Sequence, residues 1–173
     1  MGDKIRIAFY GQEEFTQVIR EMQDDFGVKD QKKILTSAMR VAMKPVLEKA
    51  KSLVSVDTGG LRASLQIEAR KPTTRDKRSI YVSPTDTVIG TVTTASGKQL
   101  AKKNFKNVRT GKKQKGIPSD ARGIANEFGT AKMAAKPYLR PALETSSSQL
   151  LDSLTLSLRT AILKYKAKQP KKG

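Results

Sequence analysis

The segment from Glu127 to Leu143 constrains the fold of this chain more than any other stretch. It reads EFGT, followed after a six-residue spacer by PYLRPAL. Gly129 allows the backbone a positive φ directly after an aromatic residue, while Pro137 and Pro141 fix φ on either side of an aromatic, a leucine and an arginine. The segment is therefore predicted to turn sharply and then to start a helix.

The composition weakens an enzymatic reading of the chain. There are no cysteines and no histidines among the 173 residues, which removes disulfides, thiolate chemistry and the commonest general base and metal ligand. Gly111 and Gly116 have the glycine spacing of a phosphate-binding loop, but Ile117 and a proline replace its Lys-Ser/Thr pair. We expect no catalytic site, no cofactor and no metal.

No apolar run approaches the roughly 18 residues of a membrane span. Residues 1–7 alternate charged and apolar side chains and lack the apolar core of a secretory signal. We therefore expect a product of the cytosol that does not enter a membrane.

The net charge of +18 is distributed unevenly, since residues 1–30 carry −3 and the remaining 143 residues carry +21. Five acids are a candidate assembly interface for basic residues of a neighbouring subunit: Glu13, Glu14, Glu21, Asp24 and Asp25.

Eight bases in a stretch without acids are candidate contacts for DNA in a lumen or for an acidic partner: Lys98, Lys102, Lys103, Lys106, Arg109, Lys112, Lys113 and Lys115. Because lysine dominates, such contacts would be diffuse and salt-sensitive rather than base-specific. A solvated, mobile segment is the alternative.

Apolar periodicity predicts an α+β fold with a small antiparallel β-sheet packed by two N-terminal helices and a long C-terminal helix. Residues 1–166 are expected to form one domain, and residues 167–173 a basic tail. The predicted elements are a strand at 4–10, a helix at 12–26, a helix from an N-cap at Asp30 to residue 54 with a bend at Pro45, two or three strands within 65–94, an extended basic loop at 96–121 and a closing helix at 141–166.

Several residues have simple local interpretations. Asp57 or Thr58 is predicted to cap a short helical turn, and Met39 and Met43 are expected to fill the core or an interface. Glu127 and Arg140 are predicted to form an ion pair, within the chain or between subunits, because an arginine at a helix N-terminus is disfavoured unless an acid compensates it.

The sequence VDTGGLRASL at residues 56–65 resembles the VDTG-x-LR-x-S motif of a tailed-bacteriophage morphogenesis family, the gene-product-ten-like tail-completion or head-to-tail joining proteins. EFGT followed by PYLRPAL resembles the second motif of that family. The resemblance covers roughly residues 34–162. Its motif residues are Asp57, Thr58, Gly59, Leu61, Arg62, Glu127, Phe128, Gly129, Thr130, Pro137, Tyr138, Arg140 and Pro141.

The chain departs from the family pattern at three places. Leu53–Ser55 replaces the usual Ala-Pro before the first motif, and residues 123–126 lack the tyrosine that usually precedes EFGT. The basic loop is longer and more basic than in the family, so the role of that loop is the least transferable part of the resemblance.

This resemblance implies a structural protein of the virion neck or tail, assembled in the host cytoplasm. It implies a homo-oligomeric, sixfold ring that contacts the head-side connector or stopper and the tail terminator or tail tube. The genome would pass through the ring, with non-specific contact to genomic DNA. A cytosolic, basic nucleic-acid-binding protein without catalytic activity is the alternative, and a ring formed without nucleic acid distinguishes the two.

Overall fold

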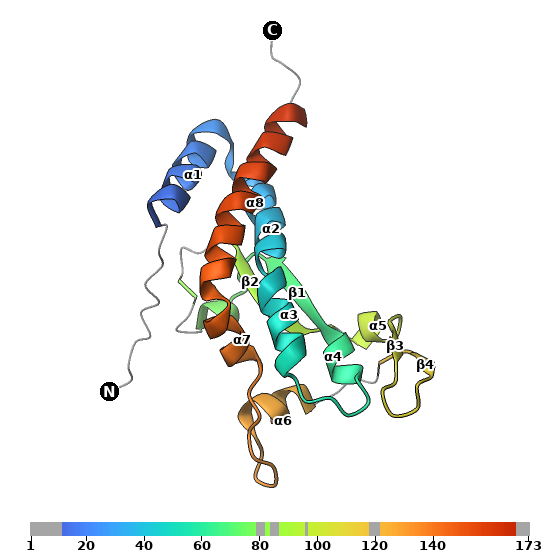
Figure 1. The fold of residues 1–173 in the computed structure, drawn as a ribbon. Helices are drawn as coiled ribbons and strands as arrows, with labels where there is room; N and C mark the ends of the chain where they lie inside the picture. The colour runs from blue at the N-terminus through green and yellow to red at the C-terminus, as the bar shows by residue number, and fades with distance from the viewer. Residues whose placement is uncertain (1–11, 79–81, 84–86, 96, 118–121, 169–173) are drawn as a thin grey trace, which may run out of the picture.

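The structure is a computed structural model that describes residues 12–78, 82–83, 87–95, 97–117 and 122–168. It confirms the α+β class. The elements are α1 (Gln12–Asp25), α2 (Val28–Ala42), α3 (Lys44–Leu53), α4 (Gly60–Ser64), β1 (Leu65–Arg70), η1 (Asp76–Arg78), β2 (Ile89–Thr94), α5 (Gly97–Leu100), β3 (Asn104–Lys106), β4 (Lys113–Lys115), α6 (Arg122–Phe128), α7 (Leu139–Thr145) and α8 (Ser147–Lys168). In Figure 1, α2, α3 and α8 run along the molecule, with α1 near one end and α6 near the other.

The first helix is confirmed, but the start of the second was predicted wrongly. Asp30 is not an N-cap, because α2 begins at Val28 with an extended Gly27 as its N-cap. The Asp30 N–H already donates to the Gly27 carbonyl at 2.9 Å, which places Asp30 inside the first helical turn. A carboxylate is favourable there as well, since it faces the positive end of the helix dipole.

The bend predicted at Pro45 is a break between two helices. Helix α2 ends at Ala42, and Pro45 lies in the first turn of α3. A proline is tolerated in a first turn because its missing N–H would have no intrahelical acceptor there. Both helices pack against α8 and the β1–β2 pair, and α3 also packs against α7.

Strands β1 and β2 form an antiparallel pair that runs in register from Leu65 opposite Thr94 to Arg70 opposite Ile89. Gly90 lies opposite Ala69, and a Cβ built on this glycine would fall 2.6 Å from the Cγ atom of Met39. The missing side chain therefore lets α2 approach the sheet closely. The third strand is not seen, since Ile80 lies outside the described residues and Val82 is in a bend.

Buried side chains form two main clusters along the helices. One lies between α1, α2 and α8 and contains Val18, Met22, Phe26, Ile34, Ala38, Ala42, Leu154, Leu158 and Ile162. The other joins α3, α4, β1 and α7 and contains Met43, Val46, Ala50, Val54, Leu61, Leu65, Tyr138 and Ala142. Met43 is therefore core, as expected, and Met39 packs against both clusters.

Two further expectations need correction. The 96–121 segment is not simply an extended loop, because it contains α5 and the antiparallel hairpin β3–β4. The closing helix is divided into α7 and α8 at the buried Ser146. The predicted strand at 4–10 and most of the basic tail, from residue 169, lie outside the described residues.

Candidate assembly and anion-binding surfaces

The first motif forms a loop that anchors the basic hairpin to the body of the protein. The Asp57 carboxylate pairs with the Arg109 guanidinium at 2.6 Å, and the Thr58 carbonyl accepts the Val108 N–H at 3.0 Å. Gly59 has φ 87°, and a Cβ on it would lie 3.2 Å from a Val108 methyl carbon. The motif therefore holds a segment that is about 50 residues away in the sequence.

Capping by Asp57 was predicted wrongly. The N-cap of α4 is Gly59, which makes no side-chain cap hydrogen bond. Thr58 contributes only weakly, since its hydroxyl accepts the Gly60 N–H at 3.4 Å. Asp57 does not cap α4 because its carboxylate pairs with the distant Arg109. Capping rules consider only residues close to the helix start, so they do not predict this pair.

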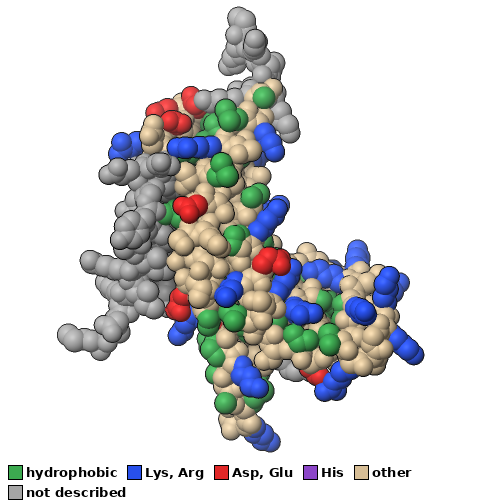
Figure 2. Space-filling model, viewed as in Figure 1, with side chains coloured by type: hydrophobic (Ala, Val, Ile, Leu, Met, Phe, Trp, Pro, Cys, Tyr) green, Lys and Arg blue, Asp and Glu red, His purple; other side chains and the backbone are tan. Residues whose placement is uncertain are grey.

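We call residues 97–117, which comprise α5, β3, β4 and their connections, the basic lobe. A small core of Ala95, Leu100, Phe105 and Ile117 supports this lobe. Asn107 shapes the hairpin loop, because its side-chain oxygen accepts the N–H groups of Arg109 and Thr110. Figure 2 shows blue side chains gathered over this lobe at the right of the view. All eight bases predicted as contacts lie in the basic lobe. Of these eight, only Arg109 forms an ion pair with an acid among the described residues.

A groove lies between the basic lobe and the helices α3 and α4. It has a volume of about 580 Å³. Three basic residues line it: Lys51 from α3, Arg62 from α4 and Lys106 from β3. The acid in its lining is Glu48, which pairs with Lys51 at 3.3 Å. Arg62, a residue of the first motif, therefore faces a positively charged groove.

The second motif centres on the carboxylate of Glu127, which caps the start of α7. Its two oxygens accept the backbone N–H groups of Tyr138 at 2.8 Å, Leu139 at 2.9 Å and Arg140 at 3.2 Å. Burial raises the pKa of Glu127, but these three donors, together with the positive charge of Arg140, outweigh burial and hold that pKa below its ordinary 4.5. Charge-assisted hydrogen bonds of this kind are about twice as strong as neutral ones.

The ion pair predicted between the Glu127 and Arg140 side chains is not formed within the chain, and pairing between subunits stays a prediction. Glu127 bonds the backbone of Arg140, and no ion pair between their side chains occurs in the described part of the chain. The free N–H groups at a helix N-terminus compete for the carboxylate, and they are fixed in place whereas the exposed Arg140 side chain is not.

The two motifs meet in the core. Leu61 of the first motif and Tyr138 of the second belong to the same buried cluster. A Cβ on Gly123 would lie 3.3 Å from Leu61 and 3.5 Å from the Tyr138 hydroxyl, so α6 also approaches this point closely. The two motifs therefore contribute to one hydrophobic core.

Gly129 has the positive φ that was predicted, at 75°. A Cβ on Gly129 would lie only 3.0 Å from the Met133 carbonyl oxygen and from the Ala135 nitrogen. Thr130 bridges to Met133 across the turn, which leads through Pro137 to the start of α7, where Pro141 follows. The requirement for glycine is thus conformational.

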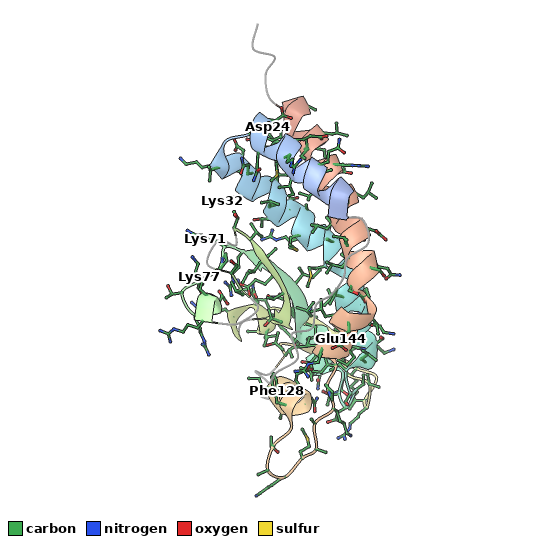
Figure 3. All side chains as sticks on the ribbon, turned by 90° about the vertical axis from the view of Figure 1, so that its left-hand side faces the viewer. Asp24, Lys32, Lys71, Lys77, Phe128 and Glu144 are labelled. Carbon is green, nitrogen blue, oxygen red and sulfur yellow. The ribbon has the colours of Figure 1, made fainter. Side chains whose placement is uncertain are left out.

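Helix α6 presents two large apolar side chains to solvent. Phe128 is 73% exposed and Ile124, one turn earlier, is 72% exposed. Gly123 and Glu127 hold the inner side of the same helix against the body. Figure 3 shows Phe128 near the end of the molecule opposite Asp24 on α1.

The acidic set lies on α1. Glu21, Asp24 and Asp25 are exposed, whereas the side chains of Glu13 and Glu14 lie outside the described part of the structure. The acidic helix and the basic lobe lie on different parts of the molecule (Figure 1). One subunit therefore carries two surfaces of opposite charge that cannot meet within the same chain.

Among the described residues, no group of three or more acidic side chains is placed to hold a metal ion. In the same part of the chain, none of the helices has the length and apolar character needed to cross a bilayer.

Residues 16–88 match the family model described as "Bacteriophage HK97-gp10, putative tail-component". The match covers less than half of the 173 residues. It confirms the resemblance to a phage morphogenesis family and includes the whole first motif. The second motif lies beyond the matched residues. No curated protein and no solved structure matches the chain.

The matched residues include α1 from residue 16 onward and the whole of α2, α3, α4, β1 and η1. They therefore contain Glu21, Asp24 and Asp25 of the acidic helix and the loop that anchors the basic lobe. The family describes a tail component, which supports a structural protein of a bacteriophage virion. The basic lobe and the apolar face of α6 are outside the match, and their roles rest on the geometry given above.

Proposed function

We propose that this protein is a tail-completion or neck subunit that forms a homo-oligomeric ring between the tail and the head-side connector. The ring is sixfold and surrounds the passage of the DNA. The observation that carries the proposal is the match of residues 16–88 to a phage tail component. Its role is structural, without catalysis, and its location is the neck of the virion.

The surface of the subunit supports assembly into a ring through a heterologous interface. A ring requires a heterologous interface, in which one surface of each subunit contacts a different surface of the next. The acidic residues of α1 are one such surface, and they meet basic residues of the neighbouring subunit or ring. The exposed outer face of α6 is part of the contact as well, because large aromatic side chains dominate the energy of protein interfaces.

Phe128→Ser tests this role of α6. We expect assembly to weaken about thirtyfold, which corresponds to loss of an interface anchor of about 2 kcal/mol. The melting temperature should change by no more than about 2 °C, because Phe128 is 73% exposed in the subunit. Sedimentation velocity over a range of protein concentrations measures the fraction of assembled protein and the concentration at which half of it is assembled.

Leu163→Ser is the matched control, since Leu163 is 67% exposed on α8. We expect that variant to assemble as the wild type does. Equal assembly of the Phe128 variant and the wild type would contradict a role for α6, and equal loss in both variants would indicate a general effect of surface hydrophobicity.

A further inference from the structure

The hairpin of the basic lobe places three lysines on one face. Lys106 lies directly opposite Lys113 in the β3–β4 register, and Lys115 lies two residues further along the same strand. Side chains alternate along a strand, so these three project away from the buried Phe105. We call Lys106, Lys113 and Lys115 the lysine face. Like charges directly opposite each other destabilise a sheet, which makes this pairing unfavourable unless an anion covers it.

The lysine face continues into the groove between the lobe and α3–α4. Lys106 belongs to both, and Arg62 lies across the groove on α4. Asn104 and Ser52 add neutral hydrogen-bonding groups to the lining. The groove and the lysine face together form one surface with a net positive charge, in which Glu48 is the acid of the groove lining and pairs with Lys51 at 3.3 Å. Such a surface suits a chain of negative charges.

This surface is fixed before any ligand binds. The pair Asp57–Arg109 and the hydrogen bond from Val108 to Thr58 hold the hairpin against α4. Phe105 and Ile117 fill the space above Gly60, where a Cβ would lie 3.8 and 3.6 Å from them. A surface that is already ordered loses less entropy when it binds.

The chemistry of the surface favours the sugar-phosphate backbone of double-stranded nucleic acid. Phe105 is the aromatic residue of the lobe and is only 9% exposed, so it is not available to stack on unpaired bases. Lysine ammonium groups bind phosphate as point charges and read little sequence. A two-stranded ribbon also has the width that the major groove of B-DNA accepts.

We propose that the lysine face and the adjoining groove bind the phosphate backbone of double-stranded DNA without sequence preference. The inference deepens the proposed function, on which it rests for the identity of the DNA as a genome passing through the ring. It gives the first motif a second purpose, because Asp57, Thr58 and Gly59 position the hairpin and Arg62 faces the ligand.

The test is the salt dependence of binding to a labelled 30-base-pair duplex of random sequence, measured by fluorescence anisotropy. The logarithm of the association constant falls with the logarithm of salt concentration by about 0.9 for each phosphate contact. In the triple variant Lys106→Gln/Lys113→Gln/Lys115→Gln, we expect the slope to decrease in magnitude by about 2.7. Its melting temperature should be unchanged or slightly higher, because the repulsion between opposite lysines is removed.

The matched control is Lys29→Gln/Lys33→Gln/Lys164→Gln, which removes the same charge from exposed positions away from the lobe. Its slope should change by less than about 1. Equal changes in the two triple variants, or no change in the lobe variant, would overturn the proposal. Displacement of the duplex by polyglutamate as efficiently as by unlabelled duplex would also overturn it, since the surface would then fit an acidic protein. The assay reads DNA binding by subunits or rings alike, so its failure is distinct from failure to assemble.

Discussion

Glu127→Ala is expected to destabilise the subunit by about 3 kcal/mol and to lower its melting temperature by about 6–12 °C. The substitution leaves the N–H groups of Tyr138, Leu139 and Arg140 without their shared acceptor. It also frees the start of α7, whose Tyr138 is only 2% exposed and joins the two motifs. Thermal unfolding followed by circular dichroism measures the change.

The effect of Glu127 should depend on pH. Because its pKa in the folded protein lies below the ordinary 4.5, the carboxylate stabilises the fold above that pH and loses this contribution as the pH falls through the folded pKa. The difference in stability between wild type and Glu127→Gln should therefore be constant near neutral pH and shrink in acid.

Arg140→Ala is the control for an ion pair between the Glu127 and Arg140 side chains. Its side chain is exposed, so the cost should be below about 0.5 kcal/mol. A Glu127→Ala protein that melts with the wild type, or an Arg140→Ala protein that loses as much stability as Glu127→Ala, would contradict the capping geometry.

Reversal of charge on α1, by Glu21→Lys/Asp24→Lys, is expected to weaken assembly about a hundredfold, which corresponds to about 3 kcal/mol. The two acids are three residues apart on one helix, and each reversal replaces an attraction across the interface by a repulsion. The wild-type assembly should itself weaken as salt is raised, because exposed charges are screened. Mass photometry at several salt concentrations measures both effects.

The control is Glu144→Lys/Asp152→Lys, which changes the net charge equally at exposed positions of α7 and α8. If the control assembles as poorly as the α1 variant, net charge rather than α1 is responsible. If the α1 variant assembles normally, the acidic helix is not an interface.

The elements with strong apolar periodicity were predictable from the sequence. Helix α1, the two strands β1 and β2, and the positive φ of Gly129 all follow from local patterns. The hairpin of the basic lobe was not predicted, because its strands have three residues each and lysine is a poor strand former. Its support comes from Phe105 and from the first motif, which are tertiary effects.

The contacts made by the two motifs could not be predicted from the sequence either, because they join residues that are far apart in the chain. Asp57 and Arg109 are far apart in the chain, and nothing in either neighbourhood indicates the pair. Glu127 precedes the helix that it caps by about a dozen residues, whereas capping rules examine the residues next to the helix start. An acid near a glycine turn, followed by a helix without its own N-cap acid, was the available signal.

Electron microscopy of the purified, nuclease-treated protein examines the ring directly. We expect closed rings of uniform size, with sixfold symmetry and a central channel, in the absence of nucleic acid. Monomers that never form rings, but bind DNA in a salt-sensitive manner, would contradict the assignment as a ring subunit and would instead favour a basic nucleic-acid-binding protein.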